Sequence, residues 1–382
     1  MHNKEKNSIF FVNPDYHYSF TYCEELRKKG WKAGIYVAPN YPSHLSDYRQ
    51  HFVKKPFFTI KGMNRYIYTI WMIKNAFRYQ TFVFYGKIRL PKYFTTKHRF
   101  SSVLRNKRIV LELAILKKMK RTLIFLPSGC HDEFLQKEFL FFDGGNVCNN
   151  CGFYDRCDDN ANLMNFEIVR KYFTTSINLG FYDTPHYKSE VIKYKCIKVS
   201  QNFVSHKNES KDEANLNRVI RIMHATSLET RNSNGKNIKG SDYVGKAIDR
   251  LRAEGFNCEY INLKGVSVSE MAQAQIESDI YIDQLIYGMW GSAAIEAMAL
   301  GKPVICYLRP EWKEKFLKNF GYSQLPIIEA TIENIYEVLR DLLLDKTKIF
   351  QQGEYSRKFA SEHYNISSNV NEFIQLIYKS KK

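Results

Sequence analysis

The C-terminal half of the chain carries three features that could together bind a phosphorylated ligand. Arg231 and Lys239 place positive charge in the loop that follows the first apolar run of this half. The stretch from Gly288 to Ser292 offers backbone N–H groups at the start of an expected helix, where an anion is stabilised by about 0.3 to 1 kcal/mol. Glu296 lies one turn inside that helix, where its carboxylate could accept two hydrogen bonds from a ribose diol. Each feature alone is common, and only their combination indicates a nucleotide.

The elements that must position these residues can be read from the stretch Asp279 to Arg309. Ile280 to Ile282 is a short apolar run that predicts a buried strand. Good helix formers fill Ser292 to Leu300, and Gly301 ends the helix before a second apolar run begins at Pro303. The pattern is strand, loop, helix, strand, as in a parallel sheet. Phosphate groups bind at the carboxyl ends of such strands.

The N-terminal half begins with the same alternation. Ile9 to Val12 predicts a strand, Tyr18 to Lys29 a helix that ends at Gly30, and Ala33 to Ala38 a second strand. A polar, charged stretch at 200–217 has almost no apolar content and predicts a linker. The fold class is therefore α/β, with two domains built on parallel sheets.

These boundaries divide the chain into four parts. We expect an N-terminal domain over 1–199, the linker over 200–217, and a C-terminal domain over 218–364. A last helix over 365–382 could pack back on the N-terminal domain. A length of 382 residues suits two domains better than one core.

In the N-terminal half, the most polar strand end follows the predicted strand Thr122 to Leu126. It includes His131, the best acid/base or substrate-orienting candidate of this half, because ligand-contacting groups gather at the carboxyl ends of parallel strands. An exposed loop histidine with no such role is the alternative interpretation.

Three clustered cysteines, Cys148, Cys151 and Cys157, predict a structural zinc site. The first two have the CxxC spacing that lets two thiolates bind one ion, and the third could be another ligand. Cys130, His131 or Asp158 could complete the set. Unmetallated thiols are the main alternative, and an iron–sulfur cluster would need a fourth cysteine.

The net charge of +18 favours an acidic partner such as anionic lipid, nucleotide phosphate or nucleic acid, although a solvated basic surface explains it equally well. The basic, aromatic stretch from Lys87 to Arg108 could face a membrane or an anionic acceptor. No apolar stretch is long enough to span a membrane, and the N-terminus lacks a signal-peptide core. We therefore expect a cytoplasmic protein, with a peripheral position on the inner face of the membrane as a further expectation.

Two sequence patterns carry a family resemblance. They are Lys239-Gly240-Ser-Asp-Tyr, and Asp279-Ile-Tyr-Ile-Asp283-Gln284 followed by Gly291-Ser-Ala-Ala-Ile-Glu296-Ala-Met-Ala-Leu-Gly301-Lys-Pro303-Val304. Over about residues 218 to 308 the chain resembles the donor half of glycosyltransferase family 4. The segment Arg357-Lys-Phe-Ala-Ser-Glu-His-Tyr364 is also similar to that family. The resemblance implies a GT-B fold, in which two Rossmann-like doubly wound domains face a cleft. The N-terminal domain would bind the acceptor and the C-terminal domain the nucleotide sugar. The implied reaction is a retaining transfer of sugar from a nucleoside diphosphate sugar.

The resemblance also implies roles for individual residues. Arg231 and Lys239 would bind the donor diphosphate without a catalytic metal, and Glu296 would bind the ribose. Gly288 stands where the family has the first glutamate of its Glu-x7-Glu motif, and Asp283 or Gln284 would take over the contact with the donor sugar. The remaining donor-binding positions are in the loop and first helical turn, at Gly288, Trp290, Gly291, Ser292 and Ala293. His131 is the nearest counterpart of the family's N-terminal histidine.

The expected substrates are a UDP- or GDP-sugar and a glycan or lipid-linked acceptor, which suggests surface polysaccharide or lipopolysaccharide synthesis. A catalytically silent GT-B binding or scaffold protein is one alternative, motivated by Gly288. A zinc-bearing nucleic-acid-binding protein is another, motivated by the charge and the cysteines. No recognition helix or RNA-binding signature supports it, so we expect no nucleic-acid partner.

Overall fold

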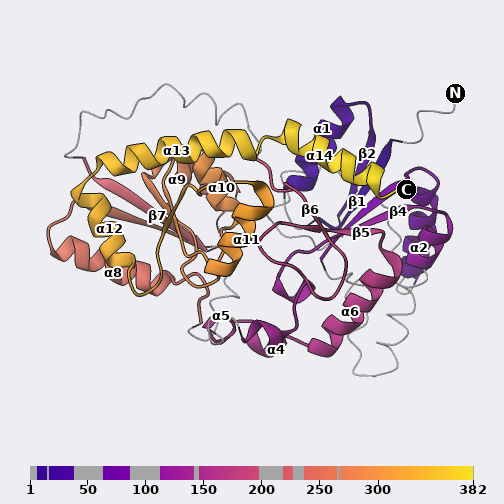
Figure 1. Cartoon of the computed structure of the whole chain (residues 1–382), viewed down its shortest axis with the longest axis horizontal. Helices are drawn as coiled ribbons and strands as arrows, with labels where there is room; N and C mark the ends of the chain where they lie inside the picture. The colour runs from indigo at the N-terminus through magenta and orange to yellow at the C-terminus, as the bar shows by residue number, and fades with distance from the viewer. Residues whose placement is uncertain are drawn as a thin grey trace.

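The computed structural model describes residues 7–14, 17–37, 63–86, 112–141, 146–197, 218–226, 236–264, 266 and 268–381. Arg231, the linker at 200–217 and the basic stretch at 87–108 lie outside these described residues. The described parts form two α/β domains, each built on a parallel sheet (Figure 1). The predicted fold class is confirmed.

The N-terminal sheet has six strands in the order β2-β1-β3-β4-β5-β6, all pairing in parallel. Every residue of β1, β3 and β4 is buried, as expected where helices cover both faces of a parallel sheet. The strands are β1 (Ser8–Val12), β2 (Lys32–Tyr36), β3 (Thr81–Tyr85), β4 (Thr122–Leu126), β5 (Thr175–Asn178) and β6 (Glu190–Val191).

Alternate residues of β1 show how this sheet is covered. Phe11 packs on one face with Phe373 of the C-terminal helix α14, and Phe10 packs on the other with Trp71 of α2. The described helices of this half are α1 (Tyr18–Lys28), α2 (Met63–Ala76), a helix over 112–118, η3 (Cys130–Asp132), α4 (Gln136–Phe139), α5 (Asn146–Asn149), η5 (Tyr154–Arg156) and α6 (Asp159–Tyr172).

The C-terminal sheet has five parallel strands in the order β11-β10-β9-β7-β8. The order reverses between β7 and β9, and ligands of open α/β sheets bind at such a switch point. The strands are β7 (Ile220–Thr226), β8 (Cys258–Lys264), β9 (Ile280–Ile282), β10 (Val304–Cys306) and β11 (Ile327–Glu329). The helices are α8 (Ser241–Ala253), α9 (Val268–Glu277), α10 (Ser292–Ala299), α11 (Pro310–Phe320), α12 (Ile335–Leu344), α13 (Thr347–His363) and α14 (Ile366–Lys379).

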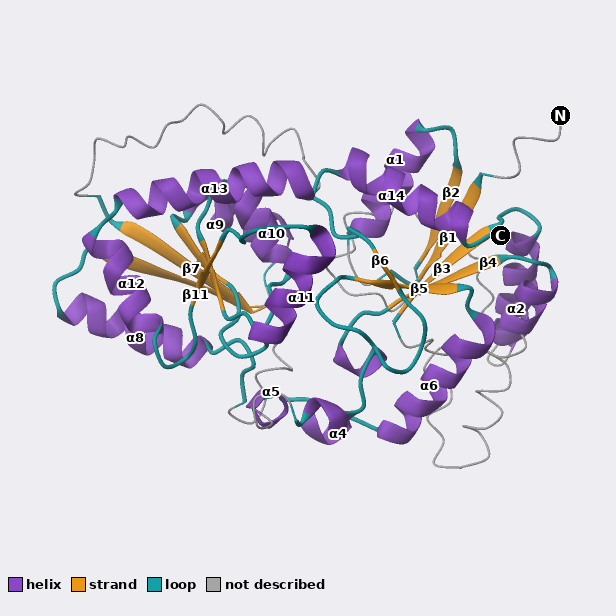
Figure 2. Ribbon diagram, viewed as in Figure 1, coloured by secondary structure: helices purple, strands orange, loops and turns teal. Residues whose placement is uncertain are grey.

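Helices α13 and α14 carry the chain from the C-terminal domain back to the N-terminal one. Figure 2 shows α13 along the C-terminal sheet and α14 beside α1. The Phe11 and Phe373 rings are stacked with centroids 6.4 Å apart, which joins α14 to the N-terminal core. The C-terminus is therefore part of the N-terminal domain's packing.

Candidate functional site

His224, near the end of β7, joins the two strands of the switch point. The Ile282 carbonyl can only accept a hydrogen bond, so Nδ1 of His224 carries the proton and donates to it at 3.0 Å. Nε2 then accepts from Ser241 Oγ at 2.7 Å, at the first residue of α8. Burial, reinforced by the charge of Lys239, lowers the pKa of His224 to about 4. A neutral imidazole thus holds β7, β9 and α8 together beneath the site.

Lys239 lies directly above this histidine and is 21% exposed. Its ammonium donates to the Ala225 carbonyl at 2.9 Å and to Asp283 Oδ1 at 3.2 Å. A lysine ammonium has three N–H donors, so one is left for a ligand. The structure therefore places the sequence-predicted cation at the switch point in a fixed orientation.

Asp283 comes immediately after β9 and is buried. One carboxylate oxygen pairs with Lys239, and the other accepts from the backbone N–H of Gly291 at 2.5 Å. Both oxygens are used to hold Lys239 and the N-terminus of α10. Asp283 thus positions the cation and the start of the helix.

Four consecutive carbonyls of the loop between β9 and α10 accept hydrogen bonds from groups elsewhere in the chain. The pairs are Arg309 Nη2 to Tyr287 O at 3.4 Å, Arg309 N to Gly288 O at 2.9 Å, Gln284 Nε2 to Met289 O, and Lys195 Nζ to Trp290 O at 3.2 Å. Each carbonyl is thereby held in one direction. In a trans peptide the N–H of the next residue points the opposite way.

The amides of Gly288, Met289 and Trp290 are consequently turned away from the side chains that bind the loop carbonyls. Within the described residues, no acceptor is placed for these three N–H groups. Successive N–H groups of this kind form an anion-binding concavity. They lie just before α10, whose dipole adds positive potential. That this loop binds phosphate stays a prediction.

Gly288 has no room for the family's glutamate. Its φ is +105°, and a Cβ atom there would lie 2.9 Å from Cβ of Arg309. Arg309 is 2% exposed, and its guanidinium lies 4.6 Å from the centre of the Trp312 ring. The side-chain amide of Gln284 is bound to the Met289 carbonyl. The residue that packs beside Gly288 is thus a buried arginine, and a contact of Asp283 or Gln284 with the donor sugar stays a prediction.

Trp290 was expected to contact the donor, but its indole is buried in the interface between the domains. Its ring makes a T-shaped contact with Phe181 of the N-terminal half, with centroids 4.7 Å apart. Its Nε1–H donates to the Tyr364 hydroxyl at 3.2 Å. The backbone of Trp290 belongs to the loop, whereas its side chain joins the domains. Ser292 and Ala293 are partly exposed at the start of α10.

Glu296 lies on α10 and is 28% exposed. Its Oε1 is 3.7 Å from Nδ1 of His17, at the N-terminus of α1. Burial raises the pKa of Glu296 to about 7. His17 was not among the predicted site residues. It follows the carboxyl end of β1, next to the N-terminal switch point between β1 and β3, and that position is the signal that could have identified it.

His131 lies in η3 after β4, and its Nε2 is 3.7 Å from Asp132 Oδ1. Asp132 in turn accepts hydrogen bonds from Ser128 N and Oγ at 2.9 and 3.0 Å. No contact that joins His131 to Lys239 or Asp283 is found in the described part of the chain. A role for His131 in catalysis stays a prediction.

The predicted zinc site is not supported. Among the described residues, which include the whole cysteine cluster, no three His, Cys, Asp or Glu side chains are placed to hold one metal ion. Cys148 is packed in the hydrophobic core, and burial raises the pKa of its thiol to about 11. The thiol of Cys157 is directed at the Phe153 carbonyl, 3.7 Å away. Within the described residues, neither these two cysteines nor Cys130 and Cys151 form a disulfide.

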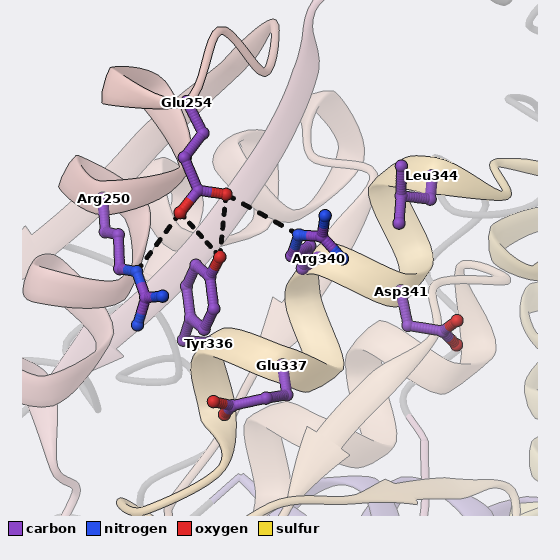
Figure 3. Close-up of a pocket in the computed structure, with 7 residues that line it drawn as sticks. All are labelled: Arg250, Glu254, Tyr336, Glu337, Arg340, Asp341 and Leu344. Carbon is purple, nitrogen blue, oxygen red and sulfur yellow. Dashed lines mark hydrogen bonds and ion pairs between the residues drawn. The ribbon is translucent and has the colours of Figure 1, made fainter.

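A surface pocket of about 480 Å³ lies between α8 and α12 (Figure 3). Its charges neutralise one another, since Glu254 binds Arg250, Arg340 and the Tyr336 hydroxyl. Glu254 follows the C-terminus of α8, whereas Ser241 begins it, so the length of a 13-residue helix, roughly 20 Å, separates the pocket from the switch point. The pocket is not part of the candidate site.

The architecture is similar to that of several solved structures. Sucrose-phosphate synthase from Thermosynechococcus elongatus aligns with a TM-score of 0.57 and 10% identity, over 98% of this chain and 98% of that one. HepE from Anabaena, in complex with UDP-glucose, aligns with a TM-score of 0.53 and 11% identity, over 97% of this chain and 99% of that one. WaaG, a glycosyltransferase involved in lipopolysaccharide biosynthesis, aligns with a TM-score of 0.53 and 12% identity, over 97% of this chain and 99% of that one. This chain has the GT-B fold.

At these identities the likeness establishes the GT-B fold and nothing finer. No protein-family model matches the sequence, and no curated protein matches it. Within this GT-B chain, the switch-point site belongs to the C-terminal domain, and His17 faces it from the N-terminal domain.

Proposed function

We propose that this GT-B protein is a glycosyltransferase that moves a sugar from a nucleoside diphosphate sugar to a glycan or lipid-linked acceptor. The observation that carries the proposal is Lys239, held at the switch point by Ala225 and Asp283, together with the three amides of Gly288, Met289 and Trp290 that have no acceptor within the described residues. Together they form a site for a diphosphate at the switch point of a fold shared with nucleotide-sugar enzymes.

The donor in this proposal is a UDP- or GDP-sugar. HepE, one of the structures with the same fold, was solved with UDP-glucose. Glu296 would accept hydrogen bonds from the ribose diol, because it lies one turn into α10 from the diphosphate site. Its ionised form is the better acceptor.

In the proposed reaction, the bond between the sugar's anomeric carbon and the diphosphate oxygen breaks and a bond to an acceptor hydroxyl forms, with retention of configuration. Negative charge grows on the leaving diphosphate. Lys239, Arg231 and the dipole of α10 would stabilise that charge electrostatically, without a metal. The acceptor's proton leaves with the departing phosphate or with solvent.

An anionic membrane surface is the proposed location of the acceptor, in surface polysaccharide or lipopolysaccharide synthesis on the cytoplasmic side. Lysine and arginine occur throughout the chain, but no acidic residue lies between Asp47 and Glu112. Within this stretch, Ile70 of α2 is 66% exposed, and Phe77, directly after the helix, is 71% exposed. Lys74 is in the last turn of the same helix. Apolar and cationic side chains together favour anionic lipid. No helix in the described residues is long and apolar enough to cross a bilayer.

A screen of nucleotide sugars tests the proposal. We expect UDP- or GDP-sugars to raise the melting temperature, and slow donor hydrolysis to release the nucleotide even without acceptor. The anomeric configuration of the released sugar, followed by NMR from the first turnovers, tests retention, and an unchanged rate in EDTA tests metal independence. If no nucleotide or nucleotide sugar shifts the melting temperature, the proposal fails.

A catalytically silent binding protein is the second candidate. The buried Arg309 beside Gly288, where the resemblance implies a carboxylate, favours it. It predicts nucleotide binding with no donor hydrolysis and no transfer to any acceptor. Time-resolved measurement of free nucleotide therefore separates the two candidates.

A further inference from the structure

The segment that follows β6 brings one lysine of the N-terminal half to the donor loop of the other domain. Lys195 belongs to this segment, and its backbone carbonyl accepts from Asn369 Nδ2 of α14 at 2.9 Å. Two residues later, the backbone N–H of Ile197 donates to the Tyr364 carbonyl at 3.1 Å. The segment is thus fixed to the crossover between α13 and α14, where the two domains join.

The ammonium of Lys195 extends from this segment to the loop before α10. It donates to the Trp290 carbonyl at 3.2 Å and lies 5.8 Å from the centre of the Phe181 ring. The same peptide presents its N–H, that of Gly291, to Asp283. Lys195 and Asp283 therefore hold the two ends of the peptide that begins α10.

The local charges favour an anion. Lys239 forms the ion pair with Asp283, and the same carboxylate attracts Lys195 at longer range, so two ammonium groups lie near one carboxylate. The surplus positive charge lies at the Trp290–Gly291 peptide, just before the N-terminus of α10. Since one carboxylate cannot balance two partly buried ammonium groups, an anion that binds nearby stabilises them.

We propose that Lys195 is a positioning residue for the donor nucleotide. It holds the Trp290–Gly291 peptide and adds positive charge beside the diphosphate site. Through it, the N-terminal domain and the α13–α14 crossover set the affinity of the C-terminal domain for nucleotide. The inference rests on the proposed function, since the anion is the diphosphate of the donor.

The charge of Lys195 also predicts a dependence on pH. Burial lowers the pKa of Lys195 to about 8, while Asp283 and the thiol of Cys306 act in the opposite direction. Lys239 is the other charged group that faces Asp283. Above pH 8 the free protein loses the Lys195 charge, so nucleotide affinity should fall. The terminal phosphate of a nucleoside diphosphate is already ionised there, because its pKa is about 6.

The experiment titrates UDP and GDP into the full chain by calorimetry at pH 7, 8 and 9. Lys195→Met should weaken binding of the preferred nucleotide at least tenfold at pH 7. The wild type should lose at least threefold in affinity from pH 7 to 9. Lys195→Arg keeps its charge over this range and should remove that loss.

Lys193→Met is the matched control. Lys193 lies two residues away, but its ammonium faces the Phe320 and Tyr322 rings at 5.8 and 5.5 Å from their centres. Its loss should change neither the affinity at pH 7 nor the pH profile.

The outcomes separate this inference from the proposed function. If the wild type binds a nucleotide and Lys195→Met binds it equally well, the inference is wrong and the proposed function stands. If Lys195→Met does not fold, the pH profile of Lys195→Arg tests the inference instead. The inference is overturned if Lys195→Arg loses as much nucleotide affinity above pH 8 as the wild type does. If the wild type binds neither UDP nor GDP, both fail.

Discussion

Nζ of Lys239 lies 3.2 Å from Oδ1 of Asp283, and the other oxygen of this buried carboxylate accepts from the first amide of α10. One carboxylate thus fixes both the cation and the helix N-terminus of the proposed diphosphate site. The pair is partly screened, because the Lys239 side chain is 21% exposed. Its main consequence is orientation, which leaves one donor of the ammonium for the ligand.

Removal of the Lys239 ammonium should abolish most of the transferase activity. We expect Lys239→Ala to lower turnover with the donor identified by the screen at least tenfold, because the charge on the leaving diphosphate loses its stabilisation. Circular dichroism should show a folded protein. Lys246→Ala, an exposed position on α8, is the control and should retain full activity. Near wild-type turnover of Lys239→Ala would argue against the assignment of the site.

A side chain at Gly288 should destabilise the protein more than one at a comparable glycine. Gly288→Ala is expected to cost about 2 to 3 kcal/mol, because a positive φ is combined with a contact to Arg309. Gly255→Ala is the control, since Gly255 has a φ of +89° and open space around its Cβ position. Its cost should be about 1 kcal/mol. Equal losses in urea unfolding would show that Arg309 does not crowd position 288.

Protonation of His224 should lower the free energy of unfolding in mild acid. Its folded pKa is about 4, below the ordinary value of 6.5, so the unfolded chain binds more protons between these two values. The contribution is complete above pH 6.5 and decreases as the pH falls towards 4, by up to about 3 kcal/mol. His224→Gln lacks the titration, so its unfolding free energy should be flatter over pH 4 to 6.5. Parallel profiles for the two proteins would contradict a neutral, buried imidazole.

The titration of Glu296 should change the stability of the protein with pH in the opposite direction. Its folded pKa of about 7 is above the ordinary value of 4.5, so the native state binds more protons and stability falls as the pH rises from 4.5 to 7. Glu296→Gln should remove this part of the slope. The same variant tests the ribose contact: the wild type should bind UDP or GDP more tightly than the 2′-deoxynucleotide, and the variant should lose that preference. A preserved preference would place the ribose elsewhere.

Much of the C-terminal domain could be predicted because its signals are local. The apolar runs of β9 and β10, the helix formers of α10 and the glycines between them lie within one stretch of 31 residues, Asp279 to Arg309. Hydrophobic periodicity and turn residues act over such distances. The cysteine cluster was misleading for the same reason, since CxxC spacing describes the chain and not the directions of its thiols.

By itself, the sequence determined the alternation of strands and helices, and it predicted a phosphate-binding loop with Lys239 and Glu296 as its polar groups. Only the tertiary structure decided which groups hold that loop. Lys195 is 95 residues from Trp290 along the chain, and His17 meets Glu296 from the other domain. Arg309 excludes a side chain at Gly288 through packing that no spacing rule encodes. Such contacts depend on how two sheets and a C-terminal crossover assemble, and local pattern does not contain that information.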